Sequence, residues 1–493
     1  MNLDWSLLTP EYILAGWAGL IIALDLFFEQ QSRKYLGYVA ALGALIAALI
    51  SLIWMDETSS FSGLIQINNY TTLFRVFFGL TAVFACIGSI RYVQDRLLHP
   101  AEYYALILVS VIGANYMAGA EELLTAYISL ELLSFSLYVL VSYAKFDLRS
   151  NEGGMKYMLL GAFSSAIFLY GISLVYGTTK TTQFGGIADA VSGDISDIRL
   201  GLYLGLVLIM AGLGFKVAAV PFHMWTPDAY EGAPLPITAL VSAISKASGF
   251  ALFLKLFSTA FLPLVDDWRL VLAGLAAATM LFGNLVALQQ HNIKRLLAYS
   301  SIGQVGYLLA GVAALNANPS LAHDAASALV LHLIGYVITN VAAFYCAIIY
   351  YNWTGREEIS EYRGLAERAP FLAMCMAIAM FSLSGMPLFA GFVTKFILFQ
   401  AIWNADLIWL ASIAAFTSFI SLYYYLTVIK QMYVSPPESL ARFPIPPLEY
   451  AALGLLIIGV FVVGLAPQPL FNAVHQSTGF LFSSGGGAFV AAP

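Results

Sequence analysis

The chain has 493 residues, of which 60% are hydrophobic and only 10% are charged. Soluble domains are about 45–50% apolar and roughly 25% charged, so this composition excludes a soluble enzyme and a disordered scaffold. The net charge is -6, and no basic tract is long enough to form a nucleic-acid surface, so we expect no nucleic-acid partner.

Apolar runs long enough to cross a bilayer recur along the whole chain, since a spanning helix needs roughly 20 such residues. The runs lie at 7–27, 35–55, 70–90, 102–120, 122–143, 153–177, 200–225, 233–257, 269–290, 295–315, 325–351, 369–403, 407–433 and 449–467. The sequence therefore predicts an all-α polytopic membrane protein with about 14 transmembrane helices. No basic region precedes the first run, so we expect it to be a retained helix rather than a cleaved signal peptide.

The loops divide unequally in charge, and Lys and Arg are enriched in cytoplasmic loops. With the N-terminus outside, the inner loops and their flanks hold Arg33, Lys34, Arg91, Arg96, Lys145, Arg149, Lys156, Lys294, Arg295, Arg356, Arg363, Arg368, Lys430 and Arg442. The outer side holds only Lys180, Arg199 and Arg269. This split predicts a multi-pass membrane protein with both termini on the outer side. The location that we expect for it is the bacterial inner membrane, whose outer side is periplasmic.

Cofactor-binding patterns are not evident in the sequence. The cysteines, Cys86, Cys346 and Cys375, are far apart in apolar stretches, and the histidines lack metal-ligand spacing. We therefore expect no metal and no cofactor on this chain, and we expect any associated redox chemistry to reside on partner subunits.

Several ionisable side chains lie inside the apolar runs, where a charge costs at least about 2.5–3.5 kcal/mol. They are Asp25, Arg75, Glu131, Lys216, Lys246, Lys255 and Lys395. Asp25, Arg75 and Lys255 lie near the ends of their runs, so we expect them to extend toward the membrane interface. The other four lie deeper, which makes them functional-site candidates.

A buried lysine beside a carboxylate has the chemistry of a proton relay. Burial disfavours the charged form of either group, whereas an opposite charge within about 4–6 Å favours it. A partner that approaches and withdraws therefore gives the lysine two protonation states of similar free energy. The alternative is a static ion pair between helices, but such a pair is weak evidence for stability and leaves the additional lysines without a partner.

Two of the deep lysines lie beside helix-breaking residues. Lys216 precedes Pro221 in GFKVAAVPFHMWTPDAYEGAP, and Lys395 follows Gly385 and Pro387 in FSLSGMPLFAGFVTKFILF. Paired Gly/Pro interruptions in separate hydrophobic segments indicate a transporter ion site, because broken helices expose polar backbone inside the membrane.

The same string, GFKVAAVPFHMWTPDAYEGAP, resembles the signature of the antiporter-like membrane subunits of NADH:quinone oxidoreductase (respiratory complex I), which are related to subunits of cation/proton antiporters. The resemblance continues in ISLELLSFSLYVLVSY, GGMKYMLLGAFSSAIFLYGISLVYG, HNIKRLLAYSSIGQVGYLLAG and EYRGLAERAP, and covers nearly the whole chain. Among the three subunit types of this family it favours subunit N, because Lys395 stands where the middle type has glutamate and only a short tail follows residue 467.

The resemblance implies two inverted five-helix repeats with broken helices 7 and 12. It implies an organisation into 1–100 (helices 1–3), 101–258 (helices 4–8), 259–433 (helices 9–13) and 434–493 (helix 14 and a short tail). An odd number of spans reverses the orientation of the second repeat, in agreement with the loop charges.

The resemblance also implies roles for individual residues. Glu131 and Lys216 pair to control one proton half-channel, Lys246 is the central relay, and Lys395 gates the outer half-channel. His223 matches the family's PFH motif, and either a structural role or a relay role is open for it. His332 is either a core histidine or a channel-lining one. The role of Lys255 is open.

The implied function is outward proton pumping, driven by quinone reduction on other membrane-arm and peripheral subunits that carry NADH, FMN, iron–sulfur clusters and quinone. Two alternatives remain at this stage. One is a subunit of a redox-independent multisubunit cation/proton antiporter, and the other is a structural membrane-arm subunit.

Overall fold

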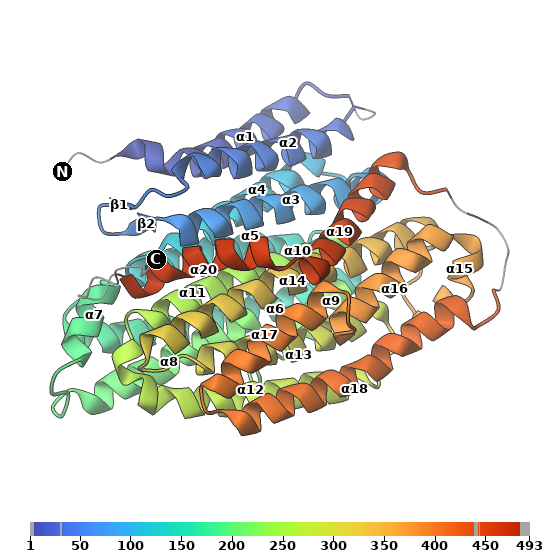
Figure 1. The fold of residues 1–493 in the computed structure, drawn as a ribbon. Coiled ribbons are helices and arrows are strands. Elements are labelled where there is room, and N and C mark those ends of the chain that lie inside the picture. Colours follow the sequence, from blue (N-terminus) through green and yellow to red (C-terminus); the bar gives the residue numbers. More distant parts are fainter. Residues whose placement is uncertain (1–3, 30–31, 438–441, 443, 484–493) are drawn as a thin grey trace.

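The computed structural model describes residues 4–29, 32–437, 442 and 444–483 of the chain. Most helices run along one common axis and pack side by side as a single bundle (Figure 1). The first-half helices are α1 (Thr9–Asp25), α2 (Tyr35–Ser51), α3 (Asn69–Arg96), α4 (Pro100–Gly119), α5 (Leu123–Val141), α6 (Leu148–Thr179), α7 (Phe184–Val191), α8 (Arg199–Val217), α9 (Trp225–Gly232), α10 (Leu235–Leu240) and α11 (Lys246–Ser258).

The second-half helices are α12 (Val265–Ala287), α13 (Ile293–Ala313), α14 (Pro319–Thr354), α15 (Leu365–Arg368), α16 (Pro370–Ser384), α17 (Ala390–Asn404), α18 (Ile408–Tyr433), α19 (Pro447–Leu465) and α20 (Gln468–Ser483). Strands β1 (Ser59–Phe61) and β2 (Ile65–Ile67) form a short antiparallel hairpin between α2 and α3. Within the residues that the structure describes, the membrane protein is thus all-α apart from this hairpin.

Thirteen helical segments in the described residues are long and apolar enough to cross a membrane, and they correspond to thirteen of the fourteen predicted runs. The remaining run, 369–403, is divided into α16 and α17, each of 15 residues. Helices α13 and α14 and the segment 235–258 are almost completely buried, so they form the centre of the bundle.

Two elements of the structure are not expected from the sequence. The segment after residue 467, predicted to be a short tail, contains the helix α20, which packs against α3 and α14. The loop between α6 and α8 contains α7, which lies at the same end of the bundle as β1 and β2 (Figure 1). Both segments are too short, or too polar on one face, to register as spanning runs.

Similar local structures recur in the two halves of the chain. Residues 121–123 pair with 182–184 through backbone hydrogen bonds of 2.9 and 3.0 Å, and 291–293 pair with 357–359 through bonds of 2.9 and 2.8 Å. In the first half, the segment before α5 pairs with the segment after α6. In the second half, the segment before α13 pairs in the same way with the segment after α14. This correspondence is the one that the predicted repeats of helices 4–8 and 9–13 require.

The ends of matching helices also agree. Lys180 and Gly355 end α6 and α14 in the left-handed conformation, with φ of 61° and 68°. Ala218 and Gly385 end α8 and α16 in the same way, with φ of 69° and 88°. A left-handed residue stops a helix by turning the chain away from its axis, so both predicted breaks are present.

Candidate functional site: a buried lysine chain at broken helices

Lys216 lies in the last turn of α8, two residues before the left-handed Ala218. Residues 218–224 are not helical, and the chain resumes a helix only at Trp225, the first residue of α9. The break leaves the last carbonyls of α8 without helical partners. The Phe215 carbonyl accepts a hydrogen bond from the Trp225 indole at 3.0 Å, which holds α8 and α9 together around the break.

Glu131 and Lys216 lie in one region of the structure but are not in direct contact. The Lys216 ammonium donates to Ser134 Oγ at 2.8 Å, and the Glu131 carboxylate accepts from Ser165 Oγ. The two charged groups are still close enough to interact electrostatically. A cavity of about 10 Å³ borders Ser134, Ser165 and Lys216, near the minimum space that one water needs. In this structure each member of the predicted pair is therefore held by its own serine, and the two do not form a closed ion pair.

Lys246 begins α11 directly after a five-residue π-helix, Val241–Ser245. Such a wide turn inserts an extra residue into a helix and is frequent at functional sites. The ammonium donates to Ser301 Oγ and lies 5.4 Å from the centre of the Tyr230 ring. The central lysine is thus held by a hydroxyl and an aromatic face.

Lys395 lies on α17, and its side chain reaches back to the break between α16 and α17. Its ammonium donates to the Leu383 carbonyl at 2.8 Å and to Ser418 Oγ at 3.1 Å. Gly385 lies beside the ammonium, because a Cβ at this glycine would lie 3.6 Å from Nζ. The broken helix therefore supplies the polar backbone that solvates this lysine, as the sequence predicts.

The three lysines share an unusual environment. All three residues are almost completely buried, with exposed fractions of 2% for Lys216, 0% for Lys246 and 4% for Lys395. Within the described part of the chain, none of the three forms an ion pair with a carboxylate. Each is instead held by neutral hydrogen-bond acceptors, which do not fix its charge.

Two other buried cations differ. The prediction that Arg75 extends to the interface is wrong, because it is enclosed together with its partner, whereas Lys255 reaches a partly exposed carboxylate in the loop between α4 and α5. Arg75 is almost fully buried and pairs with Glu11 at 2.7 Å, and Asn115 donates to the same carboxylate at 2.9 Å. Lys255 pairs with Glu121 at 2.7 Å. Both residues lie close to helix ends in sequence, but neighbouring segments cover these ends.

The histidines fall outside the direct contacts of the lysines. His223 lies in the break after α8 with its ring 4.4 Å from that of Phe282, and its Nδ1 has no partner among the described residues. His332 Nδ1 shares a hydrogen bond of 3.0 Å with Thr394 Oγ1, next to Lys395 in sequence. His332 thus lies beside the second broken helix, whereas no described contact joins His223 to a lysine.

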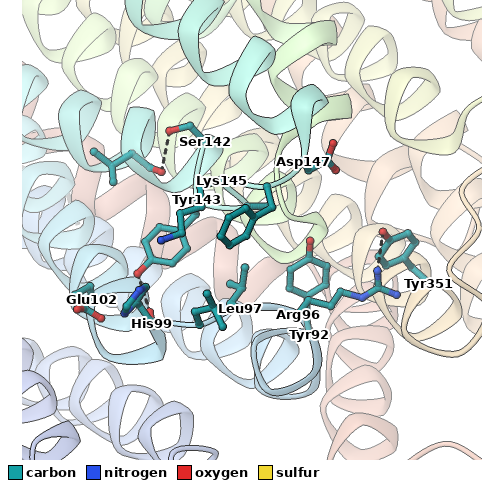
Figure 2. Close-up of a pocket in the computed structure, with 14 residues that line it drawn as sticks. Tyr92, Arg96, Leu97, His99, Glu102, Ser142, Tyr143, Lys145, Asp147 and Tyr351 are labelled. Atoms are coloured by element: carbon teal, nitrogen blue, oxygen red, sulfur yellow. Dashed lines mark hydrogen bonds between the residues drawn. The ribbon is translucent and has the colours of Figure 1, made fainter.

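A larger pocket of about 580 Å³ lies elsewhere, between the ends of α3 and α5 (Figure 2). Tyr143 donates to the His99 carbonyl at 2.7 Å, and Arg96 donates to the Tyr351 hydroxyl at 3.2 Å. Figure 2 shows Arg96 directed toward Tyr351 and away from Tyr143. The pocket contains none of the deep lysines and belongs to the loop region.

Sequence reasoning missed the neutral partners of the lysines. They are Ser134, Ser301, Leu383 and Ser418, and Ser165 is the partner of Glu131 that was also missed. A signal for Ser301 exists, because it stands beside a polar face of α13 formed by positions 300, 304 and 307.

Comparison with known proteins bears directly on this arrangement. A family model described as the transmembrane part of NADH:quinone oxidoreductase and Mrp antiporter subunits matches residues 120–421. This stretch is more than half of the chain and contains all four deep charged residues. The chain belongs to this family.

Relatives within the family match the chain almost from end to end. NAD(P)H-quinone oxidoreductase subunit 2 of Gloeothece citriformis is 39% identical over 496 residues, covering 97% of this chain and 94% of that protein. NADH-quinone oxidoreductase subunit N of Dehalococcoides mccartyi is 39% identical over 486 residues, covering 96% and 99%. The resemblance to antiporter-like subunits, and to subunit N in particular, is confirmed.

Solved structures agree with the fold. A chain of respiratory complex I from Thermus thermophilus with bound aureothin is 30% identical, with a TM-score of 0.78, and the match covers 94% of this chain and 99% of that one. A chain of the Mrp complex from Dietzia has a TM-score of 0.84 over 98% of both chains. At 21% identity, the second match shows a shared fold only.

Proposed function

We propose that this chain is a proton-translocating membrane subunit of an NADH:quinone oxidoreductase, equivalent to subunit N. The observation that carries the proposal is the row of buried lysines at helix interruptions, Lys216, Lys246 and Lys395, which are held by neutral acceptors. A lysine without a fixed carboxylate partner can lose and regain its proton inside the protein. The names of the relatives supply the reaction to which this movement is coupled.

The mechanism we propose is electrostatic. A change in charge in a neighbouring subunit alters the distance between Glu131 and Lys216, each of which is hydrogen-bonded to its own serine in this structure. When the two approach, the carboxylate favours the protonated lysine, and when they separate, burial favours its release. The proton passes to Lys246 and then to Lys395, which gates the path to the outer side. His223 is a further candidate for this relay.

The rest of the proposal concerns the assembly. NADH oxidation and quinone reduction take place on partner subunits with FMN and iron–sulfur clusters, and this chain contacts other membrane-arm subunits and lipid. The chain lies in the bacterial inner membrane with both termini outside, and its four sections are 1–100, 101–258, 259–433 and 434–493. The matching backbone pairings at 121–123 and 291–293 support the division into two inverted repeats.

Purification of the tagged chain from its native membrane tests this proposal. We expect flavin- and iron–sulfur-containing subunits to co-purify with it, in a complex that reduces quinone with NADH and pumps protons. A redox-independent antiporter predicts instead a complex of membrane subunits alone that exchanges cations for protons. That result would contradict the proposal.

A further inference from the structure

A row of buried polar side chains lies between Lys246 and Lys395. Its first part comes from α13, where Ser300, Gln304 and Tyr307 are spaced so that they share one face of the helix, with Ser301 beside Ser300. All four are buried. Hydroxyl and amide groups are costly in a membrane interior unless they are hydrogen-bonded, so their grouping on one face requires partners from other helices.

At the Lys246 end the contacts are direct. The Lys246 ammonium donates to Ser301 Oγ, and Ser301 Oγ shares a hydrogen bond of 2.6 Å with the Tyr336 hydroxyl on α14. Ser300 Oγ, adjacent in sequence, shares a hydrogen bond with the Tyr425 hydroxyl on α18. Hydroxyls of α13 and α14 therefore form a chain that ends at Lys246, and α18 brings the Tyr425 hydroxyl to the neighbouring serine.

At the Lys395 end a second set of hydroxyls is present. The Tyr307 hydroxyl donates to Thr417 Oγ1 at 3.2 Å, and its ring centre lies 5.1 Å from the Lys395 ammonium. Lys395 donates to Ser418 Oγ, the residue after Thr417. The ammonium of the second broken helix thus has one hydroxyl of α18 as a direct partner and the Tyr307 ring of α13 beside it.

Tyr425 lies between the two sets. Its hydroxyl shares a hydrogen bond with Ser300 Oγ, next to Ser301 in sequence, and electrostatic interactions relate it to Tyr336 on the Lys246 side and to Tyr307 on the side of Lys395. Its neighbour Tyr424, with ring centres 4.4 Å apart, donates to Asn284 Oδ1 at 3.0 Å. The Asn284 amide in turn donates to the Tyr307 hydroxyl at 3.4 Å.

We propose that these uncharged hydroxyls conduct protons between Lys246 and Lys395, with Tyr425 as the link. This inference rests on the proposed function. A hydroxyl donates one hydrogen bond and accepts others, so a proton taken up on one side of the oxygen is balanced by a proton released on the other. Lys246 changes from ammonium to amine, each hydroxyl ends neutral, and Lys395 changes from amine to ammonium.

The amide and carbonyl groups of the row have a positioning role and do not conduct protons. The Gln304 amide donates to the Leu383 carbonyl at 3.3 Å, and the same carbonyl accepts from Lys395. A carbonyl has no proton to release, so this branch does not conduct. Gln304 and Asn284 are positioning residues that orient the tyrosines and the broken helix.

Replacing Tyr425 with phenylalanine tests the proposal, since Y425F removes only the hydroxyl and keeps the buried ring. We expect the complete enzyme complex carrying Y425F to assemble and its coupled proton pumping in vesicles to fall about tenfold or more. Y425H retains a group that both accepts and releases a proton, so we expect partial recovery. The matched control is Y70F, because Tyr70 is a buried tyrosine whose hydroxyl donates to the Ala251 carbonyl at 2.8 Å, away from the row.

The outcomes separate this inference from the function on which it rests. Wild-type pumping in both Y425F and Y307F, with pumping lost in Lys246→Ala and Lys395→Ala, overturns the hydroxyl path and leaves the proposed function standing. Equal loss in Y425F and Y425H also overturns it, because the tyrosine would then act only through packing. Should Y425F fail to assemble, Y307F with the same control decides the question. Pumping retained in the lysine variants would refute the proposed function itself.

Discussion

At the scale of the residue, the buried charges of this protein have two kinds of surroundings. Some form closed ion pairs, which fit a structural role, and others have neutral partners, which fit the proposed proton transfer. Arg75 is held by Glu11 and the Leu7 carbonyl, with the carboxylate also accepting from Asn115. Lys246, in contrast, has a serine hydroxyl and an aromatic ring as its partners. A closed ion pair keeps both charges fixed, whereas neutral acceptors allow the lysine to change its protonation state.

Arg75→Ala is therefore expected to damage stability rather than pumping chemistry. The substitution leaves the Glu11 carboxylate buried without its cation, which costs about 3–5 kcal/mol. We predict a lower unfolding temperature of the detergent-solubilised complex and a lower yield. The double variant Glu11→Gln/Arg75→Met removes both charges and should recover much of the loss. A single variant as stable as the wild type would contradict the assignment.

The deep lysines could be predicted from the sequence because charge inside an apolar run is rare. Their partners could not, since serine, threonine and tyrosine are ordinary in membrane helices and only contacts between helices show which ones matter. The prediction for Arg75 failed for a related reason. Distance from a helix end says nothing about whether another segment, here the N-terminal helix with Glu11, covers that end.

At the scale of the element, the helix interruptions position the lysines. The breaks after α8 and α16 were predictable because prolines and glycines interrupt apolar runs. The π-helix before Lys246 was not, because the sequence Val241–Ser245 is compatible with an ordinary α-helix. Helix α20 was missed because one polar face hides it among loop residues.

Gly391 allows the two halves of the second broken helix to approach closely. A Cβ at this position would lie 1.7 Å from the Ser382 carbonyl oxygen, whereas a Cβ at Gly274 on α12 meets nothing within 4 Å. We predict that Gly391→Ala forces α16 and α17 apart, lowers stability by about 1–3 kcal/mol and reduces pumping by displacing Lys395.

Gly274→Ala is the control, and we expect it to be neutral or slightly stabilising, because alanine is the better helix former. Thermal unfolding and vesicle pumping measured on both variants check the prediction. Equal behaviour of the two would show that the close contact between α16 and α17 is not needed.

At the scale of the whole molecule, the orientation depends on the loop charges. The structure agrees with the predicted sequence of spans, since β1, β2 and α7 gather at one end of the bundle (Figure 1). These segments belong to the loops assigned to the outer side. The arrangement is thus predictable from hydropathy and charge, and the repeat relationship becomes visible in the paired backbone contacts and left-handed helix ends.

Cysteine labelling tests the orientation. Lys145 and Asp194 are exposed in loops assigned to opposite sides. In spheroplasts we expect Asp194→Cys to react with a membrane-impermeant maleimide, and Lys145→Cys to react only after the membrane is opened. The native cysteines Cys86, Cys346 and Cys375 are buried and should not interfere. The reverse pattern of labelling would contradict the assignment.

The central claim is that Lys216 carries a proton whose movement is coupled to quinone reduction. The most direct test is the proton-to-electron ratio of the complete complex carrying Lys216→Ala, measured in reconstituted vesicles after its assembly has been verified. We predict an assembled complex in which both pumping and coupled NADH:quinone turnover are suppressed. An unchanged proton-to-electron ratio at normal turnover would contradict the account.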